Sequence, residues 1–203
     1  MKSKLIVFAA SLLVAALATH ALVVLFMPEM LLSFVVRKLP GEVNRAFHSP
    51  RITNESRRIV RPSPDLLYSI CPYDLAAGET LQISALPPAD TYISLALYDE
   101  STNNYILLNR QDLSAGSRLT LNLIYAPEAS DSHDTSVDRE SKSVHSSSGD
   151  LFRRVRGSDQ TVLSPTRKGV ALFRILLKAP EQYETLRAFQ ETQDCRFIAA
   201  PAR

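Results

Sequence analysis

The sequence lacks the short motifs that mark many enzyme families. Its 203 residues contain no Gly-rich phosphate loop and no G-x-S-x-G, H-E-x-x-H or C-x-x-C pattern. These absences lower the odds of an enzyme. They do not exclude one, because catalytic groups need only meet in space and can lie far apart in sequence.

The chain also lacks a basic excess outside its first residues. Of 23 Lys and Arg, two lie in the first 26 residues, which carry no acid, so 21 basic residues remain against 21 acidic ones. A nucleic-acid-binding domain normally shows a clear basic excess. The neutral balance therefore argues against nucleic acid as a partner.

What the chain does have is an apolar run without a charged side chain, from Leu5 to Phe26. As a helix it would extend about 33 Å, enough to cross the hydrocarbon core of a bilayer. Lys2 and Lys4 precede it as in a secretory signal, and Ala16 and Ala18 form a small-x-small pattern. The run continues past that pattern, so we expect a retained anchor rather than a cleaved signal.

The orientation of this anchor is not decided by charge alone. Lys2 and Lys4 favour a cytoplasmic N-terminus, whereas Arg37, Lys38 and Arg45 after the run favour the opposite. Charge therefore leaves the orientation of the span open.

The segment after the run is expected to stay at the membrane surface. Pro28 should break or kink the helix, and Met30 to Val36 is too short to cross again. We interpret residues 1–38 as a membrane anchor and interfacial segment. Residues 39–60 form a polar connector, whose arginines either touch anionic lipid or are solvated. His20 within the run is interpreted as a tolerated polar residue, since no second span offers it a partner.

Residues 61–198 read as one β-rich domain. Apolar and polar residues alternate in Leu81–Ser84, Thr91–Tyr98 and Leu119–Leu123, with turn residues between them. Pro180 suits the first position of a helix. The predicted fold is mainly β: an antiparallel β-sandwich-like domain with a C-terminal helix, tethered by one N-terminal transmembrane helix.

Residues 128–149 interrupt this domain with a Ser- and Asp-rich segment that holds only two aliphatic residues. Such a composition buries too little apolar surface to offset the entropy of ordering. We therefore expect a flexible insertion. His133 and His145 lie in it beside several aspartates, but their spacing matches no fixed ligand pattern, and a solvated loop is favoured over a metal site.

Five residues are candidates for ligand binding: Asp65, Tyr68, Asn103, Asn104 and Arg174. Asp65 with Tyr68 would place a carboxylate and a phenol at a pocket rim, although Pro-Asp more often caps a turn. The two asparagines would bind a polar ligand or simply form a turn that tolerates left-handed backbone. Arg174, in an apolar strand, is expected either in a buried ion pair with Asp65, Asp74 or Asp99 or on an exposed edge.

The chain from Arg61 to Cys195 resembles the family called domain of unknown function 1254 (DUF1254), in its short membrane-anchored bacterial form. The order and spacing of several short motifs carry the resemblance: Pro64-Asp-Leu-Leu-Tyr-Ser69, Tyr73-Asp-Leu75, Asp90-Thr-Tyr92, Thr102-Asn-Asn-Tyr105 and Gly169–Leu177. The resemblance implies a bacterial inner-membrane protein with one span and with the bulk of the chain, a β-rich domain, in the periplasm. It implies no established reaction, cofactor or catalytic residue.

The two cysteines, Cys71 and Cys195, lie near opposite ends of the domain. In an oxidising periplasm a single pair is expected to be bridged, which predicts a disulfide between them. The alternative is two separate buried thiols, since sequence separation does not show whether the two Cα atoms come within bonding reach. Two functions remain open: an envelope protein whose β-rich domain binds a partner protein or envelope ligand, which we favour, and an envelope hydrolase or other enzyme that uses Asp65, Tyr68 and Arg174. No cofactor or metal is expected. The membrane and another envelope protein are the expected partners.

Overall fold

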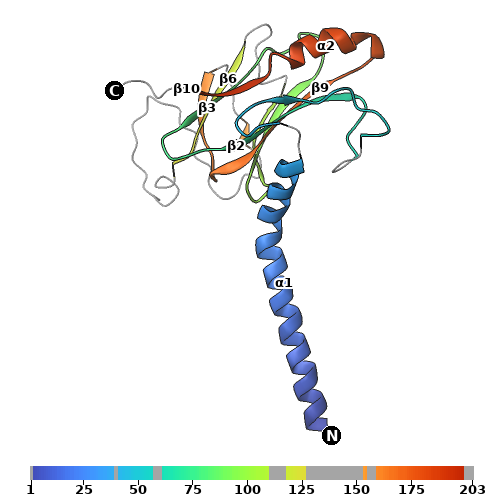
Figure 1. The fold of residues 1–203 in the computed structure, drawn as a ribbon, viewed down its shortest axis with the longest axis vertical. Coiled ribbons are helices and arrows are strands. Elements are labelled where there is room, and N and C mark those ends of the chain that lie inside the picture. Colours follow the sequence, from blue (N-terminus) through green and yellow to red (C-terminus); the bar gives the residue numbers. More distant parts are fainter. Residues whose placement is uncertain are drawn as a thin grey trace.

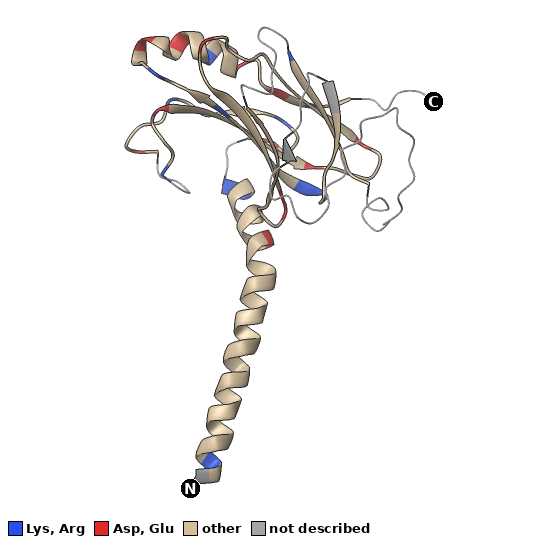
Figure 2. Ribbon diagram, turned by 180° about the vertical axis from the view of Figure 1, so that it is seen from behind, with Lys and Arg blue, Asp and Glu red and all other residues tan. Residues whose placement is uncertain are grey.

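The computed structural model of the chain describes residues 2–38, 41–56, 61–109, 118–126, 153–154 and 159–198. Helix α1 (Lys2–Lys38) projects from a β-rich domain as a stalk, with the N-terminus at its far end (Figure 1). In the described part of the chain, it is the helix whose length and composition suit a membrane span. Its charged residues are confined to its two ends and one acid near the domain (Figure 2).

The predicted break at Pro28 is wrong, because α1 continues through it to Lys38. Proline lacks an N–H and removes one backbone hydrogen bond, while apolar residues on both sides still favour the helix. Met30–Val36 is therefore the continuation of the same helix. Leu32, only 8 % exposed, is where α1 becomes buried against the domain.

The larger of two sheets has six strands in the order β1-β2-β9-β4-β5-β7. Its strands are β1 (Phe47–His48), β2 (Leu66–Asp74), β9 (Lys168–Leu176), β4 (Ile93–Asp99), β5 (Asn104–Asn109) and β7 (Arg153–Arg154). The central β2, β9 and β4 pair antiparallel over long stretches. Strand β1 lies within the expected connector, so part of that segment belongs to the sheet.

The smaller sheet has four strands in the order β10-β3-β6-β8. These are β10 (Asp194–Ile198), β3 (Thr80–Ala85), β6 (Leu119–Ile124) and β8 (Asp159–Leu163). Two pairs, β6 with β8 and β5 with β7, are parallel, so the sheets are mixed rather than wholly antiparallel. The mainly β prediction is confirmed with this refinement.

One hydrophobic core lies between the sheets, and both contribute buried apolar side chains to it. Alternation along the strands places these side chains on one face, as in Leu119, Leu121 and Leu123 of β6. The predicted disulfide is confirmed: Cys71 of β2 is bonded to Cys195 of β10, with their Cα atoms 6.5 Å apart. It joins an inner strand of one sheet to the edge strand of the other.

The predicted C-terminal helix is confirmed as the short 3₁₀ helix η3 (Pro180–Gln182) followed by α2 (Tyr183–Gln190). Leu186 enters the core, with Tyr183 and Phe189 packed against it. Helix α2 lies on the side of the domain away from α1 (Figure 1). The expected insertion at 128–149 lies outside the described residues.

Candidate functional site

Strand register brings two of the five predicted residues side by side. Tyr68 of β2 pairs with Arg174 of β9, and Arg174 pairs on its other side with Ser94 of β4. The neighbouring Phe173 points into the core and is 1 % exposed, so Arg174 faces the outer surface of the six-stranded sheet. The half-buried Tyr68 shares that face.

Arg174 does not form the aspartate ion pair that its position suggested. Its Nη2 donates to the Tyr98 hydroxyl oxygen at 2.9 Å, and no salt bridge involves it among the described residues. Of the suggested partners, Asp74 accepts from Arg167 and Asp99 accepts from Asn103. Since β9 is a central strand, Arg174 is not on a sheet edge either. Its aliphatic stem covers the sheet while the guanidinium reaches a phenol.

Asp65 lies in a turn close to Tyr68, because the Ser63 backbone N–H of that turn donates to the Tyr68 hydroxyl at 3.0 Å. Asp65 is exposed in the turn before β2, where its backbone N–H donates to Ser63 Oγ and its carbonyl accepts from Leu177 N at 2.8 Å. The turn interpretation is therefore confirmed. The enzyme reading required Asp65 to meet Tyr68 and Arg174, and neither concavity described below is lined by any of these three.

Asn103 belongs to the β4–β5 turn, as the turn interpretation predicted. The Asp99 carboxylate accepts from its backbone N at 2.8 Å and from its Nδ2 at 3.0 Å. The left-handed residue is Thr102, with φ 66°, and not an asparagine. Asn104 begins β5 and pairs with Tyr98, which places it on the outer face. Its Oδ1 and the Ser94 Oγ are buried and have no hydrogen-bond partner within the described ranges.

These residues form what we call the outer polar strip: Tyr68, Ser94, Tyr98, Asn104 and Arg174. Its half-buried members, Tyr68, Tyr98, Asn104 and Arg174, offer one cation, two phenols and a carboxamide on rigid strands, whereas Ser94 is completely buried and out of a ligand's reach. Such groups suit hydrogen bonding to a polar or anionic ligand. The sequence did not single out Ser94 and Tyr98 as site residues. Their alternation with apolar residues indicated only that they share one face of the strand.

A buried hydroxyl cluster lies under the end of the core nearest α1. Tyr73 Oη is 2.8 Å from Tyr105 Oη and 3.2 Å from Ser164 Oγ, and it donates to the Tyr98 carbonyl at 3.2 Å. Burial raises the pKa of Tyr73 to about 12 and raises that of Tyr105 well above 10. Both phenols therefore stay neutral at physiological pH, and the cluster is structural.

A serine–histidine contact is also present at the β1–β2 pairing. His48 Nδ1 lies 2.9 Å from Ser69 Oγ. Burial, followed by the nearby Arg187 charge, lowers the pKa of His48. Ser69 is completely buried, so no substrate reaches its hydroxyl. The contact therefore fixes the edge strand and does not make Ser69 a nucleophile.

A cleft of about 170 Å³ lies where α1 meets the domain. On one side α1 provides Leu32, Val36 and Arg37, and on the other the strand ends provide Asp74, Glu100 and Lys168. These strand ends lie side by side in the sheet, because Asp74 pairs with Lys168 and Asp99 pairs with Gly169. The Arg167 Nε–Asp74 Oδ1 ion pair, 2.6 Å long, borders the cleft. We call this the interfacial cleft.

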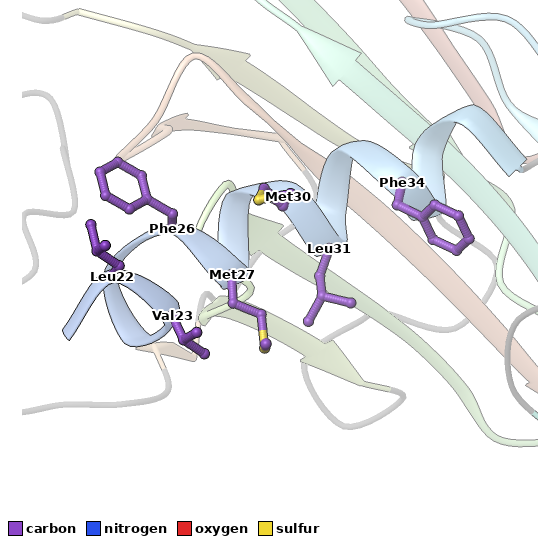
Figure 3. A pocket seen from close by; sticks show the side chains of 7 residues that line it. All are labelled: Leu22, Val23, Phe26, Met27, Met30, Leu31 and Phe34. Atoms are coloured by element: carbon purple, nitrogen blue, oxygen red, sulfur yellow. The ribbon is translucent and has the colours of Figure 1, made fainter. Parts of the chain in front are cut away.

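A second concavity is an open groove along α1 itself. Figure 3 shows its seven labelled side chains, all from this helix: Leu22, Val23, Phe26, Met27, Met30, Leu31 and Phe34. They recur at intervals of three and four residues and so share one helix face. All are exposed and apolar, with Met30 at 70 %. The groove has no polar group to orient a small ligand.

Comparison with known proteins identifies a family and a fold. The family described as "Protein of unknown function (DUF1254)" matches residues 43–196. No curated protein matches the chain. The fold is similar to the VPA0106 protein from Vibrio parahaemolyticus, with TM-score 0.50 and 12% identity over 84% of this chain and 35% of that one.

A putative uncharacterized protein from Burkholderia cenocepacia also matches, with TM-score 0.40 and 14% identity over 77% of this chain and 35% of that one. The chain thus spans about a third of the length of both solved chains. The Vibrio likeness shows the fold alone.

Proposed function

We propose that this chain, which belongs to the DUF1254 family, is a membrane-anchored envelope protein whose β-rich domain binds a polar envelope ligand or partner protein. The observation that carries the proposal is α1. Its apolar side chains are exposed along nearly the whole helix, and only its last turns meet the domain. Exposed apolar surface on this scale needs a nonaqueous neighbour, and a bilayer supplies one.

The disulfide and the N-terminal lysines support the proposed compartment. The Cys71–Cys195 bond is typical of an oxidising space such as the bacterial periplasm. Lys2 and Lys4 lie at the distal end of α1, where a cytoplasmic location suits them. The proposed arrangement is one span of the inner membrane, with the domain on the periplasmic side.

We assign ligand binding, and not catalysis, to the outer polar strip. Arg174 is the cation of the strip, and hydroxyls and an amide surround it on three strands. A rigid sheet presents such groups without the cost of ordering a loop. Asp65, the carboxylate that hydrolysis would require, lies in the exposed turn before β2.

Site-specific photocrosslinking tests the binding surface. A photoreactive phenylalanine analogue replaces Tyr68 in the full chain expressed in cells. The matched control carries it in place of Phe197, which is exposed on the other sheet. We expect a defined adduct at position 68 that disappears when Arg174→Ala is added, and none at 197. Equal adducts at both positions, or none at 68, would contradict binding by the strip.

A further inference from the structure

We propose that the interfacial cleft holds the headgroup of a membrane phospholipid that carries both a phosphate and a primary amine. This inference rests on the proposed anchoring of α1 in the bilayer. The cleft is distinct from the outer polar strip, because its residues come from α1 and from the strand ends beside it.

The position of the cleft brings it to the membrane surface. Apolar exposure on α1 continues beyond Phe26 through Met30 and Leu31 to Phe34, which is 54 % exposed. Phe34 lies within the helical turn that also lines the cleft. The apolar face from Leu5 to Phe34 is about 45 Å long, whereas the hydrocarbon core of a bilayer is roughly 30 Å thick. The helix can therefore cross the bilayer with a tilt, and its domain-proximal end then lies at the headgroups.

The cations of the cleft suit a phosphate. Arg37 approaches from α1 and Lys168 from the start of β9, and neither forms an ion pair among the described residues. A phosphate between them would accept charge-assisted hydrogen bonds from both walls. Lys38, in the same last turn of α1, adds to the positive field.

The acids of the same cleft suit an ammonium group. Glu100 has no ion-pair partner in the described part of the chain, whereas Asp74 is already engaged by Arg167. A ligand with one phosphate and one amine therefore matches both the cations and the free acid of the cleft. A purely anionic headgroup matches only the cations.

The volume also limits the occupant. About 170 Å³ equals the space of five or six water molecules at about 30 Å³ each. That space accommodates a small polar headgroup. The acyl chains would remain in the bilayer beside the apolar side chains of α1, where no polar group competes.

Lipid retention by the full-length protein tests the proposal. The protein is reconstituted in vesicles with equal amounts of phosphatidylethanolamine, phosphatidylcholine and phosphatidylglycerol, extracted in mild detergent, and its bound lipids are counted by native mass spectrometry. We expect enrichment of phosphatidylethanolamine. Lys168→Ala should lower that enrichment about tenfold, as expected for losing a charge-assisted hydrogen bond.

Two further variants make the result specific. Glu100→Gln should remove the preference over phosphatidylglycerol while the phosphate contact remains. Lys178→Ala, beyond the opposite end of β9, should leave retention unchanged, since its Nζ donates to the Asp90 carbonyl. No headgroup preference, or equal losses in the two lysine variants, would overturn the cleft proposal while anchoring stands. A protein that an alkaline wash strips from the vesicles would overturn the proposed anchoring and, with it, this inference.

Discussion

At the scale of single residues, Tyr73 and Gly169 depend on each other. They are paired across β2 and β9, and a Cβ built on Gly169 would overlap both the Tyr73 hydroxyl and the Tyr98 carbonyl. Only glycine leaves room for the phenol to cross the strand and reach Tyr105 and Ser164. The buried hydroxyl cluster is therefore possible because β9 lacks a side chain at this point.

Gly169→Ala is predicted to lower the free energy of unfolding by about 1–3 kcal/mol or more, the usual cost of overpacking a filled site. Urea unfolding followed by circular dichroism measures it. Gly78→Ala is the control, since its Cβ would meet nothing within 4 Å and only its φ of 85° opposes the change. If the Gly169 variant is as stable as the Gly78 variant, the close packing around Tyr73 is misassigned.

The raised pKa of Tyr73, about 12, predicts alkaline destabilisation. An unfolded tyrosine loses its proton near pH 10, whereas folded Tyr73 keeps it, so unfolding releases a proton and stability falls between about pH 10 and 12. The loss attributable to Tyr73 is about 2–3 kcal/mol at most. Tyr73→Phe should be less stable at pH 8 but show a shallower decline from pH 10 to 11.5. Identical declines would mean that Tyr73 is not buried as a neutral phenol.

The role of a residue could be predicted only where its neighbours in the sequence determine it. Asp65 and Asn103 lie in turns, as Pro-Asp and Asn-Asn patterns favour. The partner of Arg174 could not be predicted, because Tyr98 lies 76 positions away in sequence and meets it only through strand pairing. The Gly169–Tyr73 contact was missed for the same reason.

At the scale of elements, the disulfide fixes how the two sheets meet. Cys71 is in the large sheet, and Cys195 is in β10 at the edge of the small one, 124 positions later. Strand β10 pairs with β3 on one side only, so without the bond only five residue pairs and its side-chain packing would hold it in place. The bond thus secures an edge strand of the small sheet.

Removing the bond by Cys71→Ala with Cys195→Ala is predicted to cost about 2–5 kcal/mol of unfolding free energy. Both sulfurs are buried, so alanine also leaves a small space. Chemical unfolding of the double variant, with and without reductant, measures the loss, and reductant should then affect only the wild type. A double variant that unfolds at the wild-type midpoint would show that the small sheet does not depend on the bond.

Element prediction succeeded where periodicity is strong. Period-two alternation identified β3, β4 and β6, and Pro180 identified the start of the C-terminal helix. It failed for β1 and β10, because two and five residues with mixed polarity give no clear period. The predicted helix break at Pro28 was wrong, because one missing hydrogen bond does not end an otherwise apolar helix.

At the scale of the whole molecule, α1 and the β-rich domain meet in one place. The last turns of α1 pack on strand ends of the large sheet, while α2 and the outer parts of both sheets lie farther from the helix (Figure 1). The sequence predicted both parts and their order. It could not predict the interfacial cleft, because Arg37 and Lys168 are far apart in the chain and meet only after folding.

The central claim is that α1 is a retained anchor with the domain on the periplasmic side. Fusing alkaline phosphatase to the carboxyl end of the full chain in a bacterial host tests it directly, because that enzyme needs periplasmic disulfides to be active. We predict high activity that stays in the membrane pellet after an alkaline wash. Activity in the soluble fraction would mean that the N-terminal run is a cleaved signal, and an inactive fusion at normal expression would mean that the domain faces the cytoplasm.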